Sequence, residues 1–254
     1  MKKTSLYIIL FFLYFFLSDC SKETFAPGCY IAHISDAYDY PLKPGMPGWR
    51  LLNSTDEMDS VLQIPEDVLF SISTEGLIET VLNYPRFADL YFQEDYQFAF
   101  NILVEHFNGF SELLKRQNAA TLLLNRYKSM EPSCQENNWP SIPRTGSSTS
   151  FSFAFIEILI AQYDILQQLD NVDTNILLKE AIKKYEEKKL YDYSIFSKKH
   201  TVLIAGRILF LNNYAPFMEE YSNDVYVKDF IDKVMLNSNF DTLDRVYEFA
   251  VDFI

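Results

Sequence analysis

The chain has 254 residues, of which 16% are aromatic and only seven are glycine, and its formal net charge at pH 7 is −13. So acidic a chain lacks the basic footprint of nucleic-acid-binding proteins, and its surface is not suited to broad electrostatic contact with anionic lipid. Few glycines and many long apolar residues suit helices better than strands and turns, so the composition favours an all-α fold.

The first residues have the pattern of a bacterial export signal. Lysines at positions 2 and 3 and two polar residues precede an unbroken apolar stretch from Leu6 to Leu17. Such a stretch has the length of a secretory signal and is shorter than the roughly 20 residues of a membrane-spanning helix. We therefore expect residues 1–19 to be a signal peptide.

Cys20 is the expected site of lipid attachment. Leu17 and Ser18 fit the pattern cut by the signal peptidase that acts before a lipidated cysteine, whereas Asp19 departs from it and resembles the relaxed pattern of some diderm bacteria. Each buried methylene contributes about 0.8 kcal/mol, so two or three acyl chains anchor a protein stably. We expect a lipoprotein of the outer membrane, on its periplasmic face or at the cell surface. The alternative is an ordinary cleaved signal peptide with an incidental cysteine.

Residues 20–53 predict a lipid tether followed by an irregular, proline-punctuated arm. Its aromatic side chains are expected to pack this arm onto the body, namely Tyr30, Tyr38, Tyr40 and Trp49. The acids and aromatics of Asp36–Tyr40 could bind sugar or calcium, and the alternative is a solvated tether held by its aromatic side chains.

Residues 54–130 predict an N-terminal lobe of short helices. Ser73 has the position of a helix cap before an apolar stripe that ends at Pro85, and Asn118 is expected to cap another helix. The expected helices cover residues 55–62, a segment opened by Pro65, residues 74–84, 87–92, 95–107, 110–116 and 118–130.

Residues 131–150 interrupt the helical pattern as a long loop. Loops of this length are often functional or disordered, and Trp139 is its candidate contact residue. An oxidising envelope permits Cys29 and Cys134 to form a disulfide, and the alternative is two unpaired thiols.

Residues 151–254 predict a C-terminal helical lobe. The segment from Phe151 to Leu169 is apolar almost all round and is expected to be central, whereas 173–191 is charged on one side and is expected to be a surface helix. Residues 200–211, 224–236 and 240–254 predict further helices. The whole body is predicted to be an irregular bundle or short superhelix of about nine to eleven helices in two lobes.

Glu157 and Arg207 are charged residues within apolar helices. A buried charge is unfavourable unless it is paired. We therefore hypothesise an ion pair between these two side chains, with a structural role rather than a catalytic one.

The sequence contains none of the familiar catalytic, phosphate-binding or zinc-binding motifs. His33, His106 and His200 lie in separate segments, and a structural role is expected for His106 near a helix end. No metal or cofactor is predicted, and the catalytic residues of any enzyme activity are unknown.

Several segments of residues 40–130 resemble a family of secreted or lipid-anchored proteins of diderm bacteria for which no activity is established. The segments are Pro47–Trp49, Ile64–Asp67, Ser73–Leu77, Glu79–Pro85, Phe107–Phe110 and Glu112–Arg116. The resemblance implies an all-helical envelope protein and assigns no functional residue.

The leading functional prediction is a non-catalytic binding or scaffold protein of the cell envelope, which meets the membrane through its covalent lipid alone and another envelope protein or glycan through its body. The alternative is a hydrolase that acts on envelope or glycan material with a pair of carboxylates.

Overall fold

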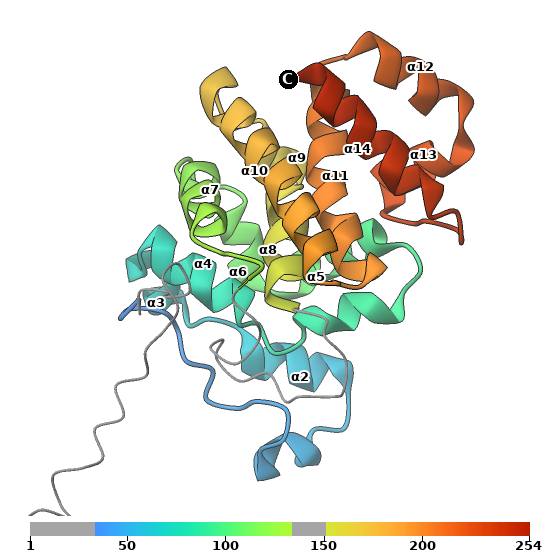
Figure 1. The fold of residues 1–254 in the computed structure, drawn as a ribbon. Coiled ribbons are helices and arrows are strands. Elements are labelled where there is room, and N and C mark those ends of the chain that lie inside the picture. Colours follow the sequence, from blue (N-terminus) through green and yellow to red (C-terminus); the bar gives the residue numbers. More distant parts are fainter. Residues whose placement is uncertain (1–33, 134–150) are drawn as a thin grey trace, which may run out of the picture.

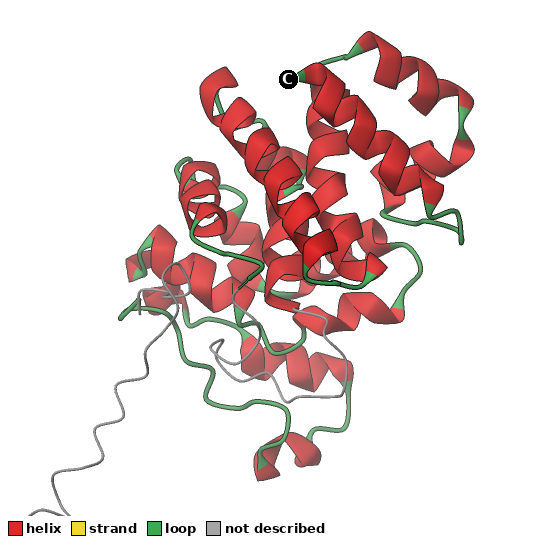
Figure 2. Ribbon diagram, in the orientation of Figure 1, coloured by secondary structure: helices red, strands yellow, loops and turns green. Residues whose placement is uncertain are grey.

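The computed structural model describes residues 34–133 and 151–254, and all its regular elements are helices (Figures 1 and 2). The all-α fold is thus confirmed for these residues. They form more helices than the nine to eleven expected, because the segment 151–169 forms two helices and a short 3-10 helix also forms in the expected arm at Pro47–Leu51. Cys20, Cys29, Tyr30, Cys134, Trp139 and His33 lie outside the described residues.

The N-terminal half begins with short helices at one end of the molecule (Figure 1). Its elements are η1 (Pro47–Leu51), α2 (Thr55–Leu62), α3 (Glu66–Ser71), α4 (Thr74–Leu82), η2 (Phe87–Phe92), α5 (Tyr96–His106), α6 (Asn108–Leu113) and α7 (Ala119–Lys128).

Side-chain caps determine where several of these helices begin. The hydroxyl of Ser73 accepts a hydrogen bond from the backbone N–H of Gly76, as its predicted cap position requires, and Asp95 accepts one from Phe98 at the start of α5. Asn118 occupies the N-cap position of α7, but its side-chain oxygen accepts a hydrogen bond from Thr74. It therefore joins α7 to α4 instead of capping α7 with its side chain.

The C-terminal half supplies the centre of the molecule and the end opposite η1 (Figure 1). Its elements are α8 (Phe151–Ile160), α9 (Tyr163–Leu166), α10 (Asn171–Leu190), α11 (Ile195–Leu211), α12 (Ala215–Asn223), α13 (Val225–Lys233) and α14 (Asp241–Phe253).

Helix α11 is the central helix, packed against α8, α10 and α14. It begins five residues earlier than expected, because Ser194 caps it by accepting a hydrogen bond from Ser197. Gly206 permits the close approach of its neighbours, since a Cβ atom there would overlap Ile231 of α13 and lie 3.0 Å from Val246 of α14. Nearly every residue of α11 from Ser197 onward is consequently buried.

The single helix expected from Phe151 to Leu169 is divided into α8 and α9. The chain turns at Ala161 and Gln162, where Gln162 has an extended backbone and its side-chain amide donates a hydrogen bond to the carbonyl of Ile158. The buried character predicted for this segment is confirmed for residues 153–160 of α8. The apolar pattern alone did not reveal this break.

The two halves share one hydrophobic core. The ring of Phe87, from η2, stacks on that of Phe155, from α8, with centroids 4.2 Å apart. Helix α4 also contacts α8, and α5 contacts α13. The sequence interruption at residues 131–150 therefore does not divide the core.

The described part of the arm is bound to α4 and to the cap that precedes it. The side chain of Asp36 accepts a hydrogen bond from the N–H of Ser73, the N–H of Tyr38 donates to the Thr80 hydroxyl, and the Tyr40 hydroxyl donates to the Thr80 carbonyl. The bond from Ser73 lowers the pKa of Asp36. A side chain at position 76 would collide with Asp36, so Gly76 allows this contact. The expected aromatic anchoring is confirmed for Tyr40, which is buried.

No helix among residues 34–133 and 151–254 is long and apolar enough to cross a membrane.

Candidate functional site

The candidate site consists of polar side chains buried along α11 and the residues that contact them. Ser197, Lys199, His200, Thr201 and Arg207 are all at most 4% exposed. A buried helix is normally apolar on all sides, and each polar group within it needs a partner. How these groups are partnered determines what the site can do.

Glu157 and Lys188 form an ion pair in the centre of the molecule. The Lys188 ammonium lies 2.8 Å from each carboxylate oxygen of Glu157, and both side chains are fully buried. The hydroxyls of Tyr127 and Thr201 donate to the same carboxylate at 2.9 and 2.8 Å. Four helices (α7, α8, α10 and α11) thus meet at one carboxylate.

The surroundings of Glu157 shift the pKa values of two of its partners. Burial, followed by the neighbouring charge of Glu157, raises the pKa of Tyr127, so its hydroxyl remains a donor. Burial lowers the pKa of Lys188, while Glu157 opposes that shift. Because both oxygens of Glu157 already accept hydrogen bonds, this carboxylate is suited to holding helices together rather than to attacking a substrate.

The predicted ion pair between Glu157 and Arg207 is wrong, although both side chains are buried as expected. The guanidinium of Arg207 donates to the carbonyls of Ala161 and Ile231 and, at 2.7 Å, to the side-chain oxygen of Gln97. Burial lowers its pKa to about 10. The positive charge of Arg207 therefore lies at carbonyl oxygens near the C-terminal ends of α8 and α13, where a cation is favourable.

The partner of Glu157 was missed because α10 was expected to lie on the surface. Its buried residues Leu177, Ala181, Lys184 and Lys188 recur at intervals of three or four, which is the spacing of one helix face. Two lysines continue that apolar face because their long stems can be buried while their amines reach polar partners. The spacing was the available signal, and the charge of the lysines obscured it.

Lys184 also has partners within the protein. Its ammonium donates to the carbonyl of Met130 at 2.7 Å and lies 3.4 Å from the carboxylate of Glu180. It also faces the ring of Tyr127, 5.0 Å from the centroid. This lysine fixes the end of α7 against α10.

Lys199 and His200 form fewer polar contacts than Lys184, Lys188 and Arg207 do. The Lys199 ammonium donates one long hydrogen bond, 3.4 Å, to the carbonyl of Val234 and lies 3.6 Å from the centre of the Tyr96 ring. The imidazole of His200 stacks against Tyr96 and meets Tyr91 edge-on, with centroids 6.0 and 6.1 Å away. No side chain of the described residues hydrogen-bonds to either imidazole nitrogen, although the ring interacts with the backbone of Phe196.

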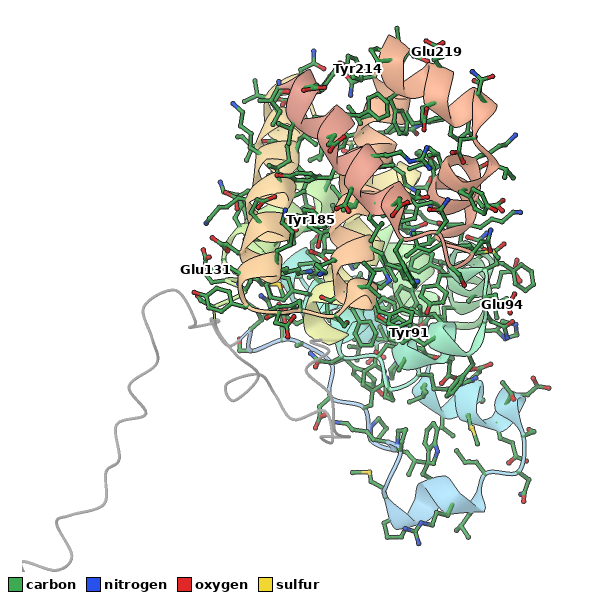
Figure 3. The ribbon with its side chains drawn as sticks, turned by 45° about the vertical axis from the view of Figure 1, so that its right-hand side comes forward. Tyr91, Glu94, Glu131, Tyr185, Tyr214 and Glu219 are labelled. Atoms are coloured by element: carbon green, nitrogen blue, oxygen red, sulfur yellow. The ribbon has the colours of Figure 1, made fainter. Side chains whose placement is uncertain are left out.

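The Lys199–His200 cluster lies where α11 begins, close to Tyr91, which Figure 3 labels in the lower part of the helical body. Burial lowers the pKa of Lys199 to about 7. Burial, with the charges of Lys199 and Lys188, also lowers the pKa of His200 well below its usual value. Both basic groups of the cluster are therefore shifted toward their neutral forms.

A second polar cluster joins α2, η2 and α5 near the surface. The carboxylate of Asp59 contacts Arg86 and the Nδ1 atom of His106, the latter at 3.2 Å, and Arg86 also contacts Asp89 at 2.7 Å. His106 is the last residue of α5, as expected for a structural histidine. Because Asp59 and Asp89 both contact Arg86, this cluster holds α2 against η2.

His106 and His200 are not brought together in the described structure, since His106 contacts Asp59 and His200 lies buried in α11. Within the described residues no group of three or more histidine, cysteine, aspartate or glutamate side chains is arranged to hold a metal ion. Asp36, the first acid of the Asp36–Tyr40 cluster, is bound to the start of α4.

A scan against protein-family models and searches of curated proteins and of solved structures found no match to this chain.

Proposed function

We propose that this chain is a lipid-anchored protein of the outer membrane whose helical body binds or scaffolds another envelope component without catalysing a reaction. The observation that carries the proposal is the N-terminal sequence, in which lysines, the apolar stretch from Leu6 to Leu17 and Cys20 follow one another as in lipoprotein signals. Acyl chains on Cys20 would hold the body within a tether's length of either the periplasmic face or the cell surface.

The arrangement of buried charge supports a scaffold role. Glu157 is paired with Lys188, and Arg207 is bonded to three oxygens, all within the protein. These contacts join helices from both halves of the chain, which suits a body that presents a fixed surface. The charged side chains at the centre thus maintain the fold and are not directed at solvent.

Exposed aromatic rings support a binding role. Phe70 and Phe92 are about four-fifths exposed, at 78% and 83%, and Phe98 is also exposed on α5. Large rings contribute strongly to protein interfaces because they bury much area with few rotatable bonds. Phe92 and Phe98 lie on neighbouring elements and are the first side chains to test as a contact surface. Trp139, the contact candidate from the sequence, lies outside the described residues.

Lipid attachment is tested by growing cells with an alkyne-labelled fatty acid and purifying the full chain. We expect the wild type to carry the label and to sediment with membranes, whereas Cys20→Ala carries no label. Equal labelling of the two proteins, or an unlabelled wild type, would contradict the anchor. Cys29→Ala is the matched control, because it removes a nearby cysteine and should leave labelling unchanged.

Binding is tested by cross-linking in intact cells, followed by purification of the lipidated chain. We expect a defined cross-linked species that is lost in the double variant Phe92→Ser/Phe98→Ser. Val172→Ser on α10, also strongly exposed at 66%, should retain it. A species that survives the double variant would place the binding surface elsewhere, and no species at all would contradict the binding role.

A further inference from the structure

The turn that carries η1 projects from the end of the molecule at which the N-terminal half begins. In Figure 1 η1 is the dark blue helix below α2, and none of its residues is buried. The arm is fixed to the body just before this turn, where Tyr40 is buried and its hydroxyl donates to the Thr80 carbonyl. Helix α2 follows directly from its cap at Ser54. Residues 41–52, the η1 turn, therefore form a short projection between two fixed points.

Apolar side chains are exposed on the η1 turn. Leu51 is 75% exposed and Met46 is 41% exposed, although both residue types are usually buried. Trp49 is partly buried and packs against the hydrophobic core. The η1 turn thus presents apolar surface at a projecting part of the molecule.

The backbone of the η1 turn needs few hydrogen bonds from water. Pro44 and Pro47 carry no N–H. The N–H groups of Met46, Trp49 and Leu52 donate to the carbonyls three residues before them, at 3.1, 3.1 and 3.2 Å. An unpaired backbone N–H is costly to remove from water, above all into lipid. This turn can therefore leave water with little loss of backbone hydrogen bonding.

The η1 turn also differs in charge from the rest of the chain. Residues 40–55 contain two cations and no acid, whereas the whole chain has a net charge of −13. Lys43 is paired with Asp39. Arg50 is exposed, and no ion pair joins it to another described residue. A free positive charge thus lies beside the exposed side chain of Leu51.

The exposed rings considered above have the opposite surroundings. Phe92 and Phe98 lie on either side of Glu94 and Asp95 in the sequence. Two acids at this surface would repel an anionic headgroup, so it is better suited to a protein or glycan partner than to lipid. The η1 turn, which combines apolar side chains with a cation, suits an anionic lipid surface.

We propose that the η1 turn docks on the phospholipid surface in which the acyl chains of Cys20 are anchored. Met46 and Leu51 enter the boundary between headgroups and acyl chains, where apolar surface is buried. Trp49 lies at the level of the headgroups, as tryptophan does at membrane interfaces, and Arg50 pairs with a lipid phosphate. The expectation that the body meets the membrane through its covalent lipid alone came from the net charge, which averages over this local cation.

Docking by so small a surface rests on the proposed lipid anchor. A few apolar side chains and one cation bind lipid only weakly by themselves, since stable attachment takes more than one signal. Acyl chains on Cys20 would make the contact intramolecular, because only the chain between Cys20 and Asp36 separates the lipid from the body. The η1 turn then meets the membrane at a high effective concentration, so a weak contact is populated.

The fluorescence of Trp49 reports docking directly. Trp139→Phe leaves Trp49 as the only tryptophan. The acylated chain of this parent variant is purified from membranes and reconstituted into vesicles of phosphatidylcholine and phosphatidylglycerol. Phosphatidylcholine that carries bromine on its acyl chains quenches tryptophan by contact. We expect bromine near the headgroup end of the chains to quench Trp49 more strongly than bromine near the chain terminus.

A pair of leucine substitutions locates the contact. Leu51→Asp should lower the ratio of docked to undocked molecules about tenfold, because it removes an inserted leucine and places a charge in the interface. Leu190→Asp is the matched control. Leu190 is 77% exposed and also follows a cation, Lys189, but it ends α10, so quenching should not change. Equal quenching in the parent and in Leu51→Asp, or an equal loss in both variants, would overturn the proposal.

Two further readouts separate docking from the anchor itself. Flotation with the vesicles and the mass of the Cys20 peptide report acylation, and Leu51→Asp should leave both unchanged. An acylated chain that floats while Trp49 stays unquenched would overturn docking and leave the anchor intact. A chain without acyl groups on Cys20 would contradict the anchor and, with it, the docking contact that rests on it.

Discussion

Replacing Lys199 with methionine should stabilise the protein at neutral pH. Methionine keeps the length of the side chain and removes the amine, which lies among aromatic rings without a carboxylate partner in the described structure. Burial lowers the pKa of Lys199 from 10.5 to about 7. Because the folded state binds this proton less tightly than the unfolded state, the lysine lowers the free energy of unfolding at every pH below about 10.5.

The magnitude follows from the size of that shift. A difference of 3.5 between the two pKa values corresponds to about 5 kcal/mol at low pH, at about 1.4 kcal/mol per unit, and to about 4 kcal/mol at pH 7. The methionine variant loses the hydrogen bond to Val234 and the contact with the Tyr96 ring, which together contribute about 2 kcal/mol. We therefore expect Lys199→Met to be more stable by about 2 kcal/mol at pH 7.

Urea unfolding, followed by circular dichroism, measures this difference. Between pH 7 and pH 10 the wild type should gain stability relative to Lys199→Met, because the proton that penalises folding is progressively lost. Lys198→Met, on the neighbouring partly exposed position, should show no such trend. A stability difference between Lys199→Met and wild type that does not change with pH would refute the assigned burial penalty.

Three further changes test the packing around α11. Glu157→Gln leaves Lys188 buried without a carboxylate and should lower the free energy of unfolding by about 3–5 kcal/mol. Adding Lys188→Met should restore much of this loss in urea unfolding, and a single variant within about 1 kcal/mol of wild type would contradict the network. Gly206→Ala places a methyl group against Ile231 and should destabilise by about 1–3 kcal/mol, seen as a lower thermal midpoint; an unchanged midpoint would show that α13 can move aside. His200→Leu should reduce acid sensitivity, since burial lowers the pKa of His200 and wild-type stability should fall by about 1.4 kcal/mol per pH unit below about pH 6.5. Parallel stability profiles of wild type and His200→Leu between pH 5 and 7 would refute this assignment.

Local signals in the sequence predicted the helices well. Ser73 and Asp95 lie at the starts of α4 and α5 as expected, because a cap depends only on the next three residues. The break between α8 and α9 was not predicted, since Ala161 and Gln162 contain no proline or glycine. That turn depends on tertiary contacts, including the guanidinium of Arg207 on the Ala161 carbonyl.

The candidate site was less predictable than the fold. Burial of Glu157 and Arg207 followed from their apolar neighbours, but their partners depended on how α10 and α13 pack against α11. Lys188 looked like a surface residue because nothing local distinguishes a lysine that reaches water from one that reaches a buried carboxylate. Lys199 was missed for the same reason, since its lack of a carboxylate partner is a property of the folded structure.

The contacts of Asp36 and Tyr40 with the region of α4 set a limit on how far the body can move from a membrane. If Cys20 carries the lipid, the tether can extend no further than Asp36, whose side chain binds the start of α4, and not to Ser54, which caps α2. At about 3.5 Å per residue, the tether spans at most about 55 Å, against about 120 Å for a chain released as far as Ser54. Releasing the whole arm as far as Ser54 would roughly double the radius of the volume that the body can search.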